Sequence, residues 1–150
     1  MDELRIRPRS NYLQSANWQE LYLLTKHWKS DIKFANYEIN FFKGLVDKYF
    51  IWVKDKDQIT QVHHLANILM HLTSELENID MAIAKHLNYI RLFINSNFSR
   101  DEEAFRVEHA MLEDKIVGFT NALRETKREI FNLTEEMLNN EKTNQLIDQL

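Results

Sequence analysis

Two histidines lie at positions where the surrounding pattern predicts apolar residues. His86 is the one polar member of a run of apolar residues spaced three and four apart, and His109 interrupts a second run of the same kind. This spacing places its members on one buried face of a helix. Two imidazoles in one buried layer can share a hydrogen bond or hold a common ligand.

Two interpretations of these histidines differ in chemistry. In the first, Thr25, His86 and His109 form a buried polar layer that sets the register of the helices and needs no cofactor. In the second, His86 and His109 bind a transition metal such as zinc, because neutral imidazoles are good ligands for zinc, copper and nickel. His27 and Glu113 lie within about one turn of the layer and would complete such a metal site.

Other catalytic chemistry has little support in the sequence. The chain has no cysteine, which excludes disulfides, thiolate metal sites and cysteine nucleophiles. It has no glycine-rich phosphate loop, no nucleophile with an adjacent base, and no paired Glu-x-x-His motifs of the kind that hold two metal ions in helical bundles. We therefore predict that the protein is not an enzyme.

The elements that must position the histidines are long helices. Two glycines and one proline among 150 residues leave almost no turn residues for strands. Three apolar runs with steps of three and four predict helices over about 17–53, 57–95 and 99–139. Each starts at a capping box, in which a short polar side chain precedes a glutamate or glutamine by three residues: Asn17 to Glu20, Asp55 to Gln58, and Ser99 to Glu102.

The short connections between these helices predict an all-α, antiparallel three-helix bundle with coiled-coil-like heptad packing. Residues equally far from a connection should face each other, and this register places Thr25, His86 and His109 in one layer. Residues 17–139 form the bundle. Residues 1–16, with Arg5, Arg7 and Arg9, are expected to be a basic flexible arm, and residues 140–150 a helical extension or a frayed tail.

Helix one has more apolar surface than a three-helix bundle can bury. Beside its core run lies a second set of large apolar residues, namely Leu23, Phe34, Tyr37, Phe41 and Trp52. Part of this set would widen the core seam, as flanking positions often do. A contiguous aromatic stripe in water is otherwise a risk for aggregation, and it is typical of a protein interface.

These patterns predict a non-catalytic helical interaction or scaffold protein. It would associate with itself, as a homo-oligomer, or with another helical protein, through the aromatic second face of helix one. The alternative is a bundle that binds a metal or small ligand at His86 and His109. A net charge of −4 with both signs interspersed gives no case for nucleic acid. The absence of a signal peptide and of a membrane-spanning run predicts a cytoplasmic location.

Overall fold

The computed structural model describes residues 16–50, 53–95 and 102–148. Within these ranges the chain forms three helices and no strand. The helices are α3 (Trp18–Phe50), α4 (Lys56–Asn95) and α5 (Glu102–Asp148). The all-α three-helix bundle is therefore confirmed. The predicted arm, apart from Ala16, and the predicted cap at Ser99 lie outside the described residues.

The first two helices begin where the capping boxes predict. The side-chain oxygen of Asn17 accepts a hydrogen bond from the backbone N–H of Glu20 at 2.8 Å. The Asp55 carboxylate accepts one from the backbone N–H of Asp57 at 3.1 Å. Each bond satisfies an N–H group that has no partner within its own helix.

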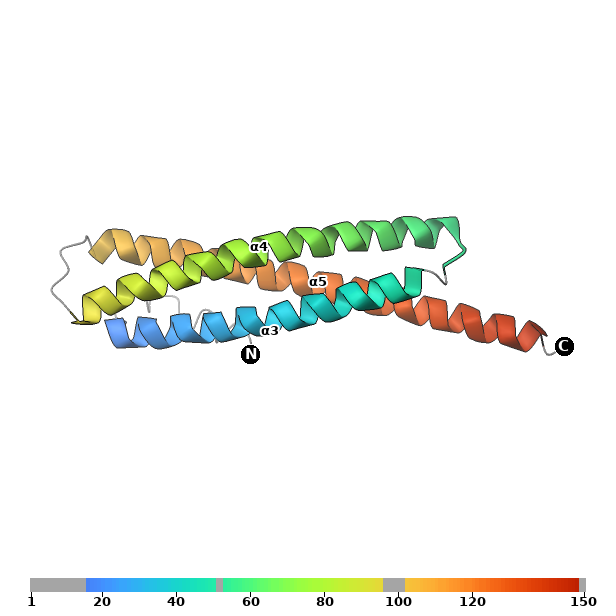
Figure 1. The fold of residues 1–150 in the computed structure, drawn as a ribbon, viewed down its shortest axis with the longest axis horizontal. Coiled ribbons are helices and arrows are strands. Elements are labelled where there is room, and N and C mark those ends of the chain that lie inside the picture. Colours follow the sequence, from blue (N-terminus) through green and yellow to red (C-terminus); the bar gives the residue numbers. More distant parts are fainter. Residues whose placement is uncertain (1–15, 51–52, 96–101, 149–150) are drawn as a thin grey trace.

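The three helices lie side by side along one long axis (Figure 1). α4 packs along both of its neighbours, whereas α3 and α5 approach each other less closely. At its C-terminal end α5 projects past α3 and past the start of α4 (Figure 1). Residues 140–148 thus continue α5, beyond the expected bundle boundary at 139. This part of the chain has no glycine or proline and several strong helix formers.

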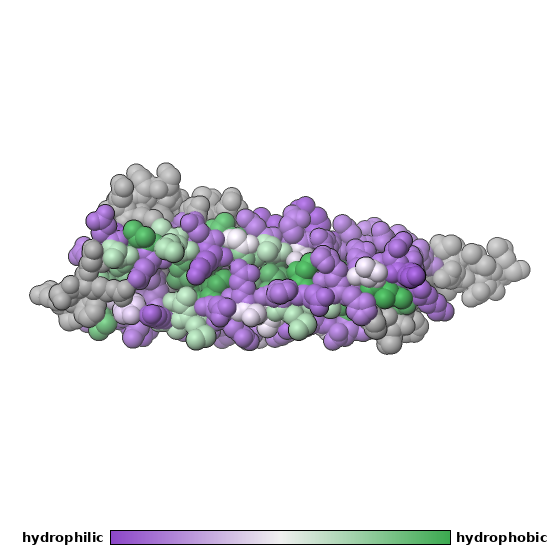
Figure 2. Space-filling model, turned by 90° about the horizontal axis from the view of Figure 1, so that it is seen from above, coloured by the Kyte–Doolittle hydropathy of each residue, from purple (hydrophilic) through white to green (hydrophobic). Residues whose placement is uncertain are grey.

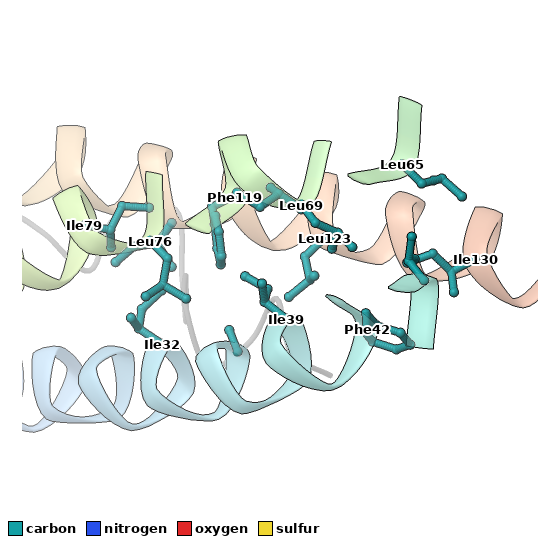
Figure 3. Close-up of a cluster of buried hydrophobic side chains, with 14 of the residues drawn as sticks. Ile32, Ile39, Phe42, Leu65, Leu69, Leu76, Ile79, Phe119, Leu123 and Ile130 are labelled. Atoms are coloured by element: carbon teal, nitrogen blue, oxygen red, sulfur yellow. The ribbon is translucent and has the colours of Figure 1, made fainter. Parts of the chain in front are cut away.

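The core consists of the predicted apolar runs. Figure 3 shows their side chains converging between the helices, with Ile39 from α3, Leu69 from α4 and Leu123 from α5. At the end of the bundle where α4 meets α5, Leu21, Ile90 and Phe105 belong to one buried cluster. Trp18 closes this cluster by stacking on Phe93, with ring centroids 4.5 Å apart.

The outer surface is mainly hydrophilic. Seen from above, polar side chains cover most of the molecule, and smaller hydrophobic areas lie between them (Figure 2). None of the helices in the described ranges has an apolar stretch that would cross a bilayer.

Candidate functional site

The structure brings the two histidines together across α4 and α5. The Nε2 atom of His86 lies 2.7 Å from the Nδ1 atom of His109, which is a hydrogen bond. His86 is 5% exposed and His109 is fully buried. The pair lies in the layer that the register arithmetic predicts, because the two residues are equally far from the α4–α5 connection.

Aromatic rings enclose both imidazoles. Trp28 from α3 stacks on His109 with centroids 4.6 Å apart, and Phe105 stacks on His86 at 4.4 Å and an interplanar angle of 6°. Both rings belong to the core runs, three or four residues from a polar member. Their contact with the histidines was not anticipated from the sequence. The sequence signal for this contact was that each ring lies one helical turn from a polar member of its own run.

Thr25 is also fully buried, and its hydroxyl is satisfied within α3. It donates a hydrogen bond to the carbonyl oxygen of Leu21 at 2.7 Å, the usual arrangement for a threonine inside a helix. Among the described residues, no buried side-chain nitrogen or oxygen lacks a hydrogen-bond partner. We refer to Thr25, His86 and His109 as the histidine layer.

The environment of the layer keeps His109 neutral. Burial is the main reason that the pKa of His109 is lowered to about 3, and the nearby His86 and Arg106 contribute to the same shift because a positive charge beside the imidazole disfavours its protonation. In a neutral pair, one ring nitrogen carries the shared proton and donates it, and the other accepts it. At neutral pH His109 therefore takes part in this hydrogen bond as an uncharged imidazole.

The four residues considered for a metal site are not gathered in one place. His27 is exposed on α3, whereas Glu113 is buried on α5, one turn from His109. The described ranges contain no group of three or more histidines, cysteines, aspartates or glutamates arranged to hold a metal ion. The ring nitrogens of His86 and His109 that face each other are bonded to each other. This geometry favours the hydrogen-bonded layer over a metal site.

A second candidate site is the aromatic face, defined by Leu23, Phe34, Tyr37 and Phe41 on α3. Each of these side chains is between 61% and 64% exposed. Trp52, the fifth predicted member, lies outside the described residues. Leu45, on the same side of α3, packs partly against the core, so widening of the core seam explains that residue but not the four exposed ones.

The aromatic face borders a groove between α3 and α5, the two helices that approach each other less closely. This α3–α5 groove has a volume of about 460 Å³. Its floor consists of the buried residues Ile32, Ala35, Ile116, Phe119 and Leu123, and its rims include Asp31, Phe34 and Glu38 on α3 and Thr120, Arg124 and Lys127 on α5.

An ion pair spans the two rims of the groove, and a row of aromatic rings connects α3 with α5. Lys127 bonds Glu38 at 2.7 Å. Phe42 makes edge-to-face contacts with Phe41 on α3 at 5.5 Å and with Phe131 on α5 at 5.7 Å. Phe131 is 58% exposed and extends the aromatic surface onto α5. Phe131 was not predicted from the sequence, although it directly follows a core position, Ile130.

Comparisons with protein-family models, with curated proteins and with solved structures found no match.

Proposed function

We propose that this protein is a non-catalytic helical interaction or scaffold protein that associates with a second copy of itself through the aromatic face of α3. The observation that carries the proposal is the exposure of Phe34, Tyr37 and Phe41, each more than 60% exposed on one side of one helix. Rings of this size on one surface stabilise a complex when they are removed from water together.

The contrast with α4 supports the choice of surface. The exposed apolar residues on α4, such as Met70 and Met81, lie eleven positions apart along the helix. Isolated apolar side chains of this kind are ordinary on protein surfaces, whereas a contiguous patch is typical of an interface.

The histidine layer has a structural part in this proposal. A buried, fully hydrogen-bonded polar pair disfavours helix registers that would leave either imidazole without a partner. It thereby favours one alignment of α4 with α5, and the stacking of Trp28 on His109 packs α3 against this pair. The cytoplasmic location inferred from the sequence belongs to the same proposal.

The test is the mass of the protein in solution. Light scattering of the wild-type chain should give a mass above the 18.1 kDa of one copy. Tyr37→Glu with Phe41→Glu should lower the mass to that of one copy, because charged side chains would have to be buried at the interface. The helical circular dichroism should not change, since both positions are exposed.

The matched control is Met70→Glu with Met81→Glu on α4, where the side chains are 66% and 71% exposed. This variant adds the same charge to an equally exposed pair of apolar positions and should keep the wild-type mass. A wild-type protein that remains a single copy at high concentration would contradict the proposal.

A further inference from the structure

We propose that residues 4–15 of the basic N-terminal arm lie in extended form in the α3–α5 groove of their own chain, with Leu4 and Ile6 against its apolar floor. This inference goes beyond the proposed self-association and does not depend on it. The arm lies outside the described residues. Its docking is inferred from the position of Ala16, from the open groove that follows, and from the residue types of the arm.

Ala16, the residue that directly follows the arm, is held against α5. It is 5% exposed and belongs to the same buried cluster as Phe105. Its carbonyl oxygen accepts a hydrogen bond from the Arg106 guanidinium at 3.0 Å. That guanidinium also lies over the Trp18 ring, 4.9 Å from the ring centroid. The arm therefore starts at the seam between α3 and α5.

One row of residues on α5 leads from this point into the groove. The row has steps of seven, which keep its members on one side of the helix: Arg106, Glu113, Thr120 and Lys127. The last two line the groove. Because α3 and α5 begin at the same end of the bundle (Figure 1), the seam that holds Ala16 continues into the groove.

The arm has the residue pattern of an extended segment with two different edges. Apolar and basic residues alternate from Leu4 to Arg9, so an extended chain carries the apolar side chains on one edge and the arginines on the other. Pro8 within this stretch cannot continue a helix and favours an extended conformation for the residue before it. The apolar edge matches the floor of the groove, which consists of buried apolar side chains.

The charges along the seam favour a position of the arginines toward α3. Asp31 and Glu38 lie on the α3 rim, whereas the α5 rim carries Arg124 and Lys127. Arginine side chains can keep their guanidinium groups in water and still reach carboxylates beside the groove. Glu113, between Ala16 and the groove, is 4% exposed, and a buried carboxylate on this path also favours a basic segment.

The arm is long enough to span the groove. Thr120 and Lys127 lie about 21 Å and 32 Å beyond Arg106 along α5, at a rise of 1.5 Å per residue. An extended chain advances about 3.3 Å per residue, so the ten residues before Ala16 reach up to about 33 Å. Residues 4–9 therefore come level with the groove at or somewhat below full extension.

Cross-linking within the full chain tests this docking, because the chain has no cysteine of its own. Ile6→Cys keeps a small apolar side chain on the arm, and Thr120→Cys places the second thiol on the α5 rim. A short bis-maleimide should join the two in a product of one chain mass, 18.1 kDa, plus one linker. Arg124→Cys, on the same rim, replaces Thr120→Cys if that variant loses helical circular dichroism.

The first control is Ile6→Cys with Ser74→Cys. Ser74 is exposed on α4 at the height of Asn121, because the two residues are equally far from the α4–α5 connection. Docking raises the effective concentration of the arm at the groove, so the Thr120 pair should react at least about tenfold faster than the Ser74 pair.

The second control separates docking from mere proximity of the arm to the seam. Leu4→Asp, added to the Thr120 pair, should slow the reaction toward the rate of the Ser74 pair, because a carboxylate is unfavourable on an apolar floor. Asn11→Asp adds the same charge outside the alternating stretch and should leave the rate unchanged.

Each remaining outcome would overturn the proposal. Equal rates for the Thr120 and Ser74 pairs, or an unchanged rate after Leu4→Asp, would show that the arm does not dock in the groove. A product of two chain masses in place of the one-chain product would place the arm in the groove of a second copy. The mass of the wild-type chain in light scattering tests self-association separately.

Discussion

The histidine layer and the aromatic face depart from the usual distribution of side chains in opposite directions. His109 is polar and fully buried, whereas Phe34 and Phe41 are apolar and 64% exposed. The layer is satisfied within one copy, because His86 bonds His109 and aromatic rings cover both. Most of the aromatic face has no cover within its own bundle.

This difference separates what stabilises the fold from what is available for function. Buried polar groups are tolerated when they are fully hydrogen-bonded, and they then favour one arrangement of the helices over others. Exposed rings contribute little to the stability of a single copy, because most of their surface is in contact with water in the folded chain as well as in the unfolded chain. Substitutions in the layer should therefore change stability, and substitutions on the face should change association.

The largest effect on stability should follow His109→Ala. This change removes the hydrogen bond to His86 and the stacking on Trp28, and it leaves a cavity in the core. We expect a loss of about 3–5 kcal/mol in the free energy of unfolding, measured by urea titration at pH 7. His27→Ala, at an exposed position, is the control and should change stability by less than about 0.5 kcal/mol. Equal effects of the two substitutions would contradict the burial described for the layer.

The next effect should be a dependence of stability on pH. The pKa of His109 is lowered to about 3 in the folded chain, so between pH 6.5 and that value the unfolded state binds more protons. Stability should be fully present above pH 6.5 and should fall with decreasing pH by up to about 1.4 kcal/mol per pH unit. Urea titrations at several pH values would measure this slope. Carboxylates add their own dependence below about pH 5, so the decisive interval lies between pH 5 and 6.5.

A smaller effect should follow replacement of both histidines. His86→Leu combined with His109→Leu keeps most of the volume and removes both polar groups, so stability at pH 7 should stay the same or rise by roughly 1–2 kcal/mol. The slope between pH 5 and 6.5 should become smaller. A loss of several kcal/mol would mean that the hydrogen bond itself is a major source of stability.

The same double variant is the control for metal binding. Added zinc should not change the melting temperature of the wild-type chain, because the facing nitrogens of the two histidines are already bonded to each other. A rise in the wild-type melting temperature that is absent from the double variant would show that the layer binds the metal.

The smallest effect should come from the ion pair across the groove. Lys127 and Glu38 are 29% and 23% exposed, and partly exposed pairs contribute little because water screens them. Lys127→Ala should lower the free energy of unfolding by less than about 1 kcal/mol in a urea titration. A much larger loss would mean that this pair, in addition to the core, holds α3 against α5.

The fold could be predicted from the sequence because its signals are local and repeated. The apolar steps of three and four determine which face of each helix is buried, and Asn17 and Asp55 mark two helix starts. Short connections then limit the register enough to place His86 opposite His109. The pairing of His86 with His109 follows from their equal distances, in residues, from the connection between α4 and α5.

The details of the histidine layer and of the α3–α5 groove depend on side-chain contacts that the residue spacing does not determine. His27 lies one residue before a core position, Trp28, and a rotation of about 100° per residue is enough to turn it outward. The stacking of Trp28 on His109 depends on ring orientation, which the spacing leaves open. The groove depends on how far α3 and α5 stand apart, which is set by the side chains of all three helices together.

The most direct test of the central claim is oxidation of the wild-type chain by hydroxyl radicals at increasing protein concentration. If the aromatic face is the surface of self-association, oxidation of Phe34, Tyr37 and Phe41 should fall as concentration rises, while Met70 and Met81 on α4 should remain equally reactive. If the oxidation rates of the three aromatic residues do not change with protein concentration, as those of the two methionines should not, the aromatic face is not where copies of this chain meet.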